Sequence, residues 1–450
     1  MTDLAIVGGS VWDGTGAPLR PATTVLVADG RIEAVSADLE VPPGAERIDA
    51  RGKFVMPGLI DMHVHVQLCG EDSLLAFLGT GVTSVRDLGS DVSTSLPLRD
   101  ALAAGERPGP RMFVYGPLLD GEPSVLRGAL SSLVRPSGDI EAGEAAIEEL
   151  IAAGVDGVKL YAGLRPELLE AMVRAVGGRV PVTGHLGRTW ASEAARAGID
   201  CLEHVHATAY QDVARPEDRH GREDGNGANP QYWRWLCLGW ANADLDAPHV
   251  AELIELLVER GVAMSPTTVL ITGGWATDEA LSEPGQRYRP RVMSERMAEM
   301  RRVREQAAES GRLPPDLEIP DDVGKRARAN ELEFLRRLHA AGGTVVPSTD
   351  VGAAPMQVPG FSLHRELALL FEGGIAPSEV LGAATRVAAQ VLRRGDELGT
   401  LEAGKLADVL VVDGDPLANI EDTRKVERVV RGGRVFEPSE LLEQIDTAEG

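Results

Sequence analysis

The sequence predicts an α/β protein in which a (β/α)8 (TIM) barrel carries a small discontinuous β-sandwich built from both ends of the chain. Two observations lead to this fold class. Strand-like and helix-like stretches alternate through residues 57–390, which is typical of right-handed βαβ units and a parallel sheet. Short strand-like segments occupy both ends, and neither end is long enough to bury a good core alone. We therefore expect a barrel over residues 57–396, flanked by sandwich segments 1–56 and 397–450.

The terminal segments show hairpin patterns. Apolar residues at Thr24–Val27 and the alternating stretch Arg31–Val35 flank Asp29-Gly30, a strong two-residue hairpin signal. Near the other end, a second pair is expected at Val426–Val430 and Arg434–Phe436, around a glycine-rich turn. The last residues, 438–450, are acidic and polar, so we expect a short surface helix or a frayed tail.

The middle of the chain supplies eight strand candidates and several helices between them. The strand candidates are Leu59–Val66, Val82–Leu88, Arg111–Gly116, Gly157–Tyr161, Val180–His185, Ile199–His204, Val262–Thr267 and Thr344–Asp350. The helical stretches include Ala145–Ala153, Pro166–Val176, Ala191–Ala197, Val250–Arg260 and Ala327–Ala341, with a further helix starting near Pro377. Eight such units predict a closed barrel.

Two connections are unusually long, at about residues 207–249 and 270–326. The first carries the aromatic cluster Tyr232–Trp235 and then Trp240, in a chain with few aromatic residues. The second contains a highly charged helical stretch, Ser294 to Ser310. Long loops in compact domains are commonly lids or binding loops. The alternative is an oligomer contact or plain surface elaboration.

Composition limits the class of partner and compartment. Of 450 residues, 43% are hydrophobic and 25% charged, as in ordinary soluble globular proteins. The net charge of -24 repels phosphate backbones and anionic lipid, so neither nucleic acid nor a membrane is expected as a partner. No apolar run approaches the ~20 residues of a membrane span.

Three dispersed cysteines, Cys69, Cys201 and Cys237, form no CxxC pair and fit a reducing compartment. Residues Met1–Leu4 lack the basic start of a signal peptide. We expect a cytoplasmic protein.

Polar residues follow the predicted strands at the end where barrel enzymes carry their active sites. His63 and His65 follow the first strand, and a bare pair of this kind could equally be two surface histidines. The positions that add to the pair are Lys159 on the fourth strand and the residues that end three others: His185 on the fifth, His204 on the sixth and Asp350 on the eighth. Four histidines and one aspartate suit zinc or a similar divalent ion, so their order favours a metal site.

These residues resemble the amidohydrolase superfamily, and within it the imidazolonepropionase-like and prolidase-like members. The resemblance covers almost the whole chain. It rests on the Pro57–His65 stretch, Lys159, His185, Glu203-His204, Asp350, Ala383-Ala384-Thr385 and the Gly399–Asp408 signature. It implies a metal-dependent hydrolase with a barrel and a split β-sandwich.

The resemblance also implies a ligand set for two divalent metal ions, with zinc as the expected metal. His63, His65 and Asp350 would bind the more buried ion, and His185 and His204 the second. Lys159 would bridge both as a carboxylated lysine, because an ammonium has donors and no acceptor. The alternative is an unmodified Lys159 in a one-metal site.

The implied activity is hydrolysis of an amide or peptide-like C–N bond in a small-molecule substrate: a dipeptide such as Xaa-Pro, an N-acyl amino acid or a cyclic amide. A hydroxide bridging the two ions would attack the carbonyl, with Asp350 as proton shuttle. Tyr161 or a nearby histidine would stabilise the oxyanion; the alternative role for Tyr161 is to position substrate or to pack. The alternatives are a one-metal deaminase and a non-catalytic metal-binding scaffold. Arg188 stands where a deaminase would place Glu, which disfavours the first alternative.

The remaining candidates are weaker. His206, Arg86, Arg188 and His364 are interpreted as supporting or surface residues, and His220, His249 and His339 as structural or exposed. A homo-oligomer is the prior expectation for an enzyme of this kind.

Overall fold

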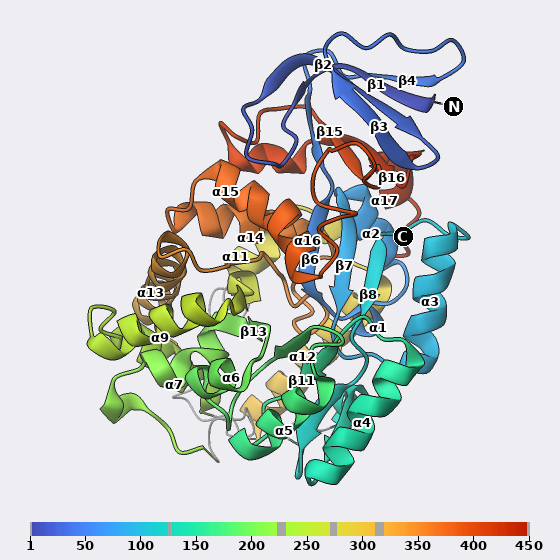
Figure 1. Cartoon of the computed structure of the whole chain (residues 1–450). Helices are drawn as coiled ribbons and strands as arrows, with labels where there is room; N and C mark the ends of the chain where they lie inside the picture. Colours follow the sequence, from blue (N-terminus) through green and yellow to red (C-terminus); the bar gives the residue numbers. More distant parts are fainter. Residues whose placement is uncertain are drawn as a thin grey trace.

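The two ends of the chain meet in one β-sheet beside a larger α/β body (Figure 1). The computed structural model describes residues 2–124, 126, 128–222, 231–270, 277–310 and 319–447. The N-terminal strands are β1 (Thr2–Val11), β2 (Arg20–Ala28), β3 (Arg31–Ser36), β4 (Glu46–Asp49) and β5 (Phe54–Pro57). The C-terminal strands are β15 (Val409–Val412), β16 (Val426–Arg431) and β17 (Arg434–Phe436).

Strands β5 and β15 join the two ends. They pair antiparallel, with Met56 opposite Leu410, in a sheet ordered β17-β16-β15-β5-β1-β2-β3, and β4 pairs with β1. Both predicted hairpins are present as antiparallel pairs, β2–β3 and β16–β17. The sheet's core cluster takes Ile6 and Val25 from one end and Val409 and Val430 from the other. Each end therefore supplies apolar surface that the other covers.

Parallel strands form the α/β body. One sheet has the order β6-β7-β8 and the other β10-β9-β11-β12-β13-β14. Their bounds are β6 (Leu59–Val64), β7 (Val82–Asp87), β8 (Arg111–Val114), β9 (Leu118–Gly121), β10 (Val134–Ser137), β11 (Val158–Leu160), β12 (Val182–Gly184), β13 (Cys201–Glu203) and β14 (Ala263–Ser265). The third predicted strand ends at Val114, because Gly116 is left-handed (φ 69°) and Pro117 lacks an N–H. The chain then continues as β9 beside β11, and neither β9 nor β10 was predicted.

The eighth predicted strand, Thr344–Asp350, is not a regular strand. It forms single bridges, Val345 with Met264 of β14 and Val351 with Val64 of β6. Val346 N donates to Met264 O at 2.9 Å, and Met62 N donates to Pro347 O at 3.3 Å. Pro347 has no N–H, and Asp350 has a left-handed backbone (φ 57°), so the pairing is interrupted. The segment nevertheless links the two parallel sheets.

Helices follow the strands as the sequence predicted. Those that match the predicted stretches are α4 (Ile140–Ala153), α5 (Pro166–Val176), α6 (Ala191–Ala197), α9 (Pro248–Arg260), α13 (Asp321–Ala340) and α15 (Pro377–Gly382). The others around the body are α1 (Val66–Cys69), α2 (Ser73–Gly79), α3 (Val92–Ala104), α11 (Thr277–Ser282), α14 (Phe361–Glu372), α16 (Ala388–Val391) and α17 (Pro438–Leu442). In α4, Asp139 caps the first turn through Ala142 N, and left-handed Gly154 ends the last.

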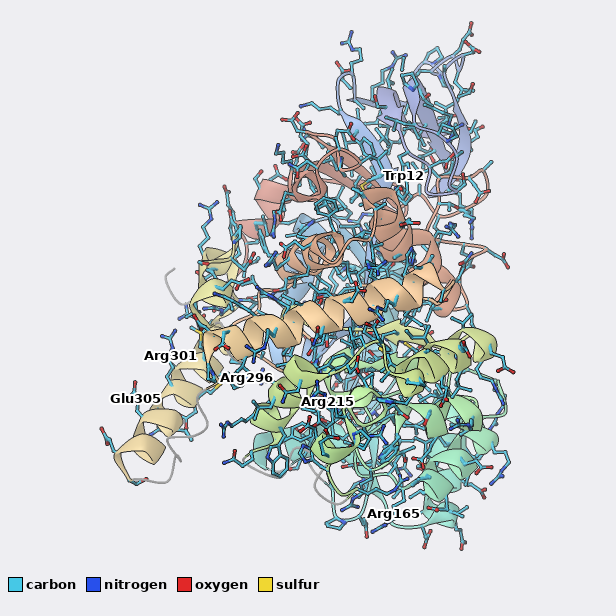
Figure 2. The ribbon with its side chains drawn as sticks, turned by 90° about the vertical axis from the view of Figure 1, so that its left-hand side faces the viewer. Trp12, Arg165, Arg215, Arg296, Arg301 and Glu305 are labelled. Carbon is cyan, nitrogen blue, oxygen red and sulfur yellow. The ribbon has the colours of Figure 1, made fainter. Side chains whose placement is uncertain are left out.

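Both long connections contain helices. The first holds α7 (Tyr210–Val213) and α8 (Tyr232–Asn242), where buried Trp240 packs edge-to-face on Phe334 at 5.9 Å between centroids. The second holds α12 (Arg291–Glu309), which projects from the body with Arg296, Arg301 and Glu305 along it (Figure 2). Parts of both connections lie outside the described residues. Within the described chain, no helix has the length and apolar character needed to cross a membrane.

Candidate metal centre and active site

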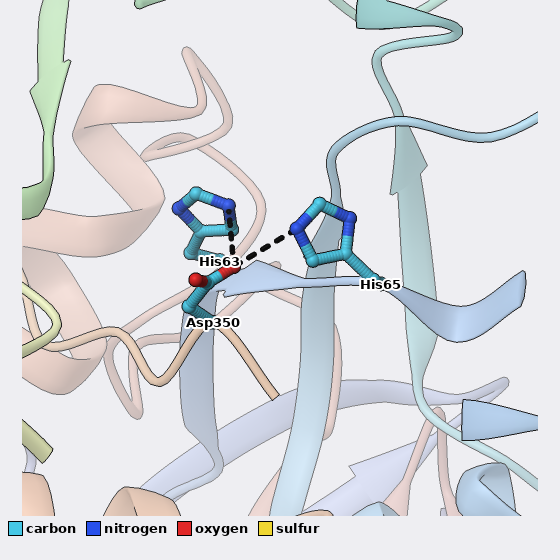
Figure 3. A group of neighbouring side chains, drawn as sticks. All are labelled: His63, His65 and Asp350. Carbon is cyan, nitrogen blue, oxygen red and sulfur yellow. Dashed lines mark hydrogen bonds and ion pairs between the residues drawn. The ribbon is translucent and has the colours of Figure 1, made fainter. Parts of the chain in front are cut away.

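Three donor side chains converge at the carboxyl end of β6. Asp350 Oδ1 lies 2.9 Å from His65 Nε2 and 3.2 Å from His63 Nε2 (Figure 3). One ligand atom from each residue lies within 4.8 Å of the others, and all three residues are buried. Imidazole nitrogens and a carboxylate are a common donor set for a divalent metal. The structure thus brings together the three residues predicted for the more buried metal.

Asp61 sets the register that makes this convergence possible. Its buried carboxylate accepts hydrogen bonds from His63 N at 3.2 Å, Thr349 N at 3.1 Å and Thr349 Oγ1 at 2.7 Å. These bonds tie β6 to the 344–351 segment, and Asp350 N donates to His63 O at 2.8 Å. Burial raises the pKa of Asp61 to about 7. Asp61 therefore fixes the backbone positions of both His63 and Asp350.

His185 and His204 form a second group beside the first. Their ring centroids are 4.4 Å apart, and the His204 centroid is 4.7 Å from that of His63. His204 Nδ1 lies 2.8 Å from Thr267 Oγ1, which leaves Nε2 as the available ligand atom. Both predicted ligands of the second metal are therefore next to the first group.

The backbone is strained where these groups meet. His204 (φ 59°), Thr267 (φ 51°) and Asp350 (φ 57°) all adopt the left-handed region that non-glycine residues avoid. Each such residue costs on the order of 1–3 kcal/mol and persists where surrounding structure enforces it. The clustering of three at one place is typical of a functional site.

Lys159 lies on β11 and lines the same cavity as the histidines. Its side chain is buried, and Nζ has no hydrogen-bond partner among the described residues. Burial lowers the pKa of Lys159 to about 8. A neutral amine is therefore accessible near neutral pH, and the neutral amine is the form that adds carbon dioxide. His65 Nδ1 is likewise buried and unpartnered in the described structure, on the edge of the ring opposite the Nε2 atom that faces Asp350.

Burial also controls the charge of the histidines. It lowers the pKa of His63, His185 and His204 well below the ordinary value, and the charge of Lys159 adds to the effect. Neutral imidazole is the form that ligates a metal, because a protonated ring has no free lone pair.

Glu203 is a site residue whose role the sequence reasoning did not identify. Its Oε2 lies 2.8 Å from His63 Nδ1, and its Oε1 accepts from Arg86 Nη2 at 2.5 Å and from Thr183 Oγ1. A carboxylate at Nδ1 orients the ring and leaves Nε2 toward the metal position. One sequence signal could have revealed it: Arg86 stands inside a buried strand, where a guanidinium needs a carboxylate partner.

The weaker candidates are split between the cavity and the scaffold. His206 lines the cavity, where its ring stacks on Trp233 at 5.5 Å and its Nδ1 lacks a partner among described residues. Tyr161 also lines it, with its ring 4.8 Å from His185.

Five of the weaker candidates lie away from the cavity. Arg188 donates to Gly163 O at 3.2 Å, and His364 is buried between Thr423 Oγ1 and Thr80 O. His220 stacks on Tyr210, His249 lies near Val213 O, and His339 pairs with Glu379.

The candidate residues open into a cavity of about 340 Å³. Its inner end is polar, with His63, His65, Lys159, His185, His204 and Asp350. The remaining wall is mainly leucine, methionine, alanine and the aromatic residues Tyr232 and Trp233. This volume falls at the small end of the ~300–1,000 Å³ of small-molecule sites.

The amidohydrolase family model matches residues 54–436. The chain belongs to the amidohydrolase family. An imidazolonepropionase of Aromatoleum aromaticum is 26% identical over 85% of this chain and 83% of its own length. A dihydroorotase of Anaeromyxobacter dehalogenans is 25% identical over 91% of this chain and 88% of its own. Higher identity is confined to short stretches: a deacetylase of Agrobacterium fabrum is 37% identical over 81 residues, 20% of its length.

Solved structures show the same fold. A Xaa-Pro dipeptidase with bound methionine has a TM-score of 0.68 at 20% identity, covering 96% of this chain and 99% of its own. A bottromycin amidohydrolase has a TM-score of 0.71 at 21% identity, and the match covers 98% of this chain and 90% of its own. The predicted membership, with imidazolonepropionase-like and prolidase-like relatives, is confirmed. As an amidohydrolase, the protein is a hydrolase that acts on C–N bonds.

Proposed function

We propose that this amidohydrolase is metal-dependent and cleaves an amide or peptide-like C–N bond in a small molecule. The observation that carries the proposal is the convergence of Asp350 Oδ1 on His63 Nε2 and His65 Nε2, at 3.2 and 2.9 Å. This donor set lies at the inner end of a cavity of ligand size. Two divalent ions, with zinc expected, would supply an activated water nucleophile and a Lewis acid for the substrate carbonyl.

The ligand roles follow the two groups of side chains. His63, His65 and Asp350 would hold the more buried ion, and His185 and His204 the second, with carboxylated Lys159 between them. The ring contacts between His63 and His204 and between His185 and His204 support a shared site. The buried, unpartnered Lys159 Nζ supports the carbamate, because a buried amine without a partner is otherwise costly.

The catalytic roles belong to two residues on the cavity wall. We assign Asp350 as the proton shuttle, because its carboxylate is buried at the inner end of the cavity, where the scissile bond would lie. Tyr161 would donate its hydroxyl to the developing oxyanion; burial raises the pKa of this hydroxyl, so it stays protonated as a donor.

The one-metal deaminase is the second candidate on this fold, since an adenine deaminase of Paracoccus denitrificans is 43% identical over 67 residues, 11% of its own length. Arg188, where that activity would use an acid, donates to Gly163 O and does not line the cavity. A non-catalytic scaffold would leave the ligand-sized cavity unexplained.

A second part of the proposal concerns how the strands of the α/β body close. We infer that β6, β7, β8 with its continuation β9, β11, β12, β13, β14 and residues 344–351 close into an eight-stranded barrel over residues 57–396, with the terminal segments as its β-sandwich. The bonds of the 344–351 segment to β14 and β6 support the closure. The cytoplasmic location and the homo-oligomer remain predictions.

The test combines metal analysis with a substrate screen. Protein expressed with zinc and bicarbonate should contain close to two divalent ions per chain by elemental analysis. Screening dipeptides, N-acyl amino acids and cyclic amides for amine release should find a substrate whose turnover stops on chelation. Full activity with one ion would reject the bridged site, and ammonia release from aminated heterocycles alone would favour the deaminase.

A further inference from the structure

The cavity wall beyond the metal centre is apolar. It is assembled from separate segments of the chain: Leu68 of α1, Leu118 of β9, Leu133, Trp233 of α8, Leu270 and Met356. Side chains from so many elements face one space, so the apolar character is a property of the whole site.

Charged side chains are scarce in this wall. Among the described lining residues, Lys159 and Asp350 alone carry a formal charge, and both belong to the proposed metal centre. A substrate carboxylate or ammonium that is buried against these described lining residues would have no charge partner among them, which is costly.

Two arginines near the cavity donate their guanidinium hydrogen bonds to backbone carbonyl groups. Arg296 Nη1 donates to Leu68 O at 3.0 Å and to Gly352 O at 2.6 Å. Arg289 Nη2 donates to Met356 O at 3.3 Å. These guanidinium groups hold the segments that form the wall and are not among the residues that line the cavity. Figure 2 shows Arg296 on α12, beside the body.

Two residues place the apolar wall near solvent. Trp233 is 48% exposed and stacks on His206, while Met300 of α12 is 42% exposed, and both line the cavity. Large exposed apolar side chains at a cavity are typical of ligand recognition. The substrate would then pass Trp233 and Met300 with its apolar part remaining among them.

We infer that this hydrolase takes an uncharged amide whose larger substituent is aromatic or aliphatic and carries no free carboxylate or ammonium. The inference rests on the proposed function and narrows it, because free dipeptides and N-acyl amino acids carry a charged group that would enter the cavity with the amide and meet its apolar wall. Neutral acyclic amides and neutral cyclic amides are the fitting class.

The test uses para-nitroanilides of caproic, adipic and ε-aminocaproic acid, which differ in charge at one end of a similar chain. With the zinc-loaded enzyme, kcat/KM for the neutral caproic compound should exceed that for the other two by about 100-fold. A charged compound cleaved as well as the neutral one would overturn the inference.

A binding experiment separates this inference from the proposed activity. Three matched ketones, in which a methylene replaces the amide nitrogen, are titrated into the zinc-loaded enzyme by calorimetry. Tighter binding of the neutral ketone by about 10-fold or more supports the apolar site even if no amide is cleaved, in which case the proposed function alone fails. Equal or weaker binding of the neutral ketone, or no binding of any, overturns the inference.

A pair of variants on one helix gives the matched control. Met300→Arg adds a cation at the cavity, whereas Val303→Arg adds one at a position that is 53% exposed and does not line it. Met300→Arg should raise the affinity for the adipic ketone, relative to that for the caproic ketone, by about 5-fold or more. Val303→Arg should leave this ratio of affinities unchanged. Equal effects of both variants would show that the charge acts over the general surface, against the inference.

Discussion

The carboxylate of Glu203 is hydrogen-bonded to the ring of His63, with Oε2 2.8 Å from Nδ1. The same carboxylate pairs with Arg86 at 2.5 Å, and all three side chains are buried. The contact orients the ring so that Nε2 faces Asp350. One buried charge pair thus connects the interior of the body to the proposed metal ligand.

Glu203→Gln should weaken metal binding by about 10–100-fold, because a neutral amide replaces the charged acceptor that fixes the orientation of the His63 ring. It should also lower the free energy of unfolding by about 3–5 kcal/mol, since Arg86 is left buried without its partner. Chelator competition and urea unfolding measure the two effects.

Arg86→Met is the matched control for Glu203→Gln. It removes the other half of the pair but leaves the carboxylate beside His63, so stability should fall while metal affinity falls less. Equal metal loss in both variants would mean that the effect is general destabilisation and not ring orientation.

Lys159→Ala should lower the bound metal from about two ions per chain to one or fewer and abolish turnover, because the proposed bridge is lost. Acetate or propionate with added zinc should partly restore both, since a short carboxylate fits the space and supplies oxygen ligands. Elemental analysis and amine release measure the outcome. Lys53→Ala, at a surface ion pair, is the control and should retain its metal. Retention of both ions by Lys159→Ala would remove Lys159 from the ligand set.

Much of the scaffold was predictable because it depends on local patterns. The Asp29-Gly30 turn has left-handed backbone at both residues (φ 50° and 73°), as a two-residue hairpin requires. Helix α5 begins at the proline that marked its start. The meeting of His63 with His204 and Asp350 was predicted from the rule that parallel strand ends share one face, together with the family resemblance.

The rest required three-dimensional information. The interruption of the last strand depends in part on left-handed Asp350, which its residue type alone does not predict, because aspartate adopts that region at only a minority of its positions. The role of Glu203 was missed because its partners, His63 and Arg86, are more than 100 residues away in sequence. His206 was interpreted as a supporting residue, but the helical turn after β13 places it on the cavity wall.

Asp350→Asn should retain the fold and lose turnover by about 10²–10⁴-fold, because an amide cannot accept the proton that the carboxylate would take. The fold should survive, since the backbone bond from Asp350 N to His63 O does not depend on the side chain. Circular dichroism and thermal unfolding check the fold, and kcat at saturating metal checks the role. Near-native rates with full metal content would exclude Asp350 as the proton shuttle.

His364→Gln should reduce the loss of stability in mild acid. The ring of His364 lies 2.9 Å from both Thr423 Oγ1 and Thr80 O. Burial lowers its pKa to about 3 and outweighs the opposite effect of the Thr80 carbonyl, so the folded chain holds the ring neutral. An unfolded histidine titrates near 6.5, so below that pH the unfolded state binds a proton that the folded state excludes. The stability is therefore complete above pH ~6.5 and falls as the pH decreases toward 3.

From pH 7 to 5 this single histidine should cost about 2 kcal/mol of unfolding free energy, which the glutamine variant avoids. Glutamine can keep one donor and one acceptor at the site. The effect of the substitution on the unfolding free energy at pH 7 is measured separately. Urea unfolding of both proteins at the two pH values gives the difference. His339→Gln, at a more exposed histidine paired with Glu379, is the control and should leave the wild-type pH dependence nearly unchanged. If the unfolding free energy of wild type and of His364→Gln changed by the same amount between pH 7 and 5, His364 would not be held neutral in the folded protein.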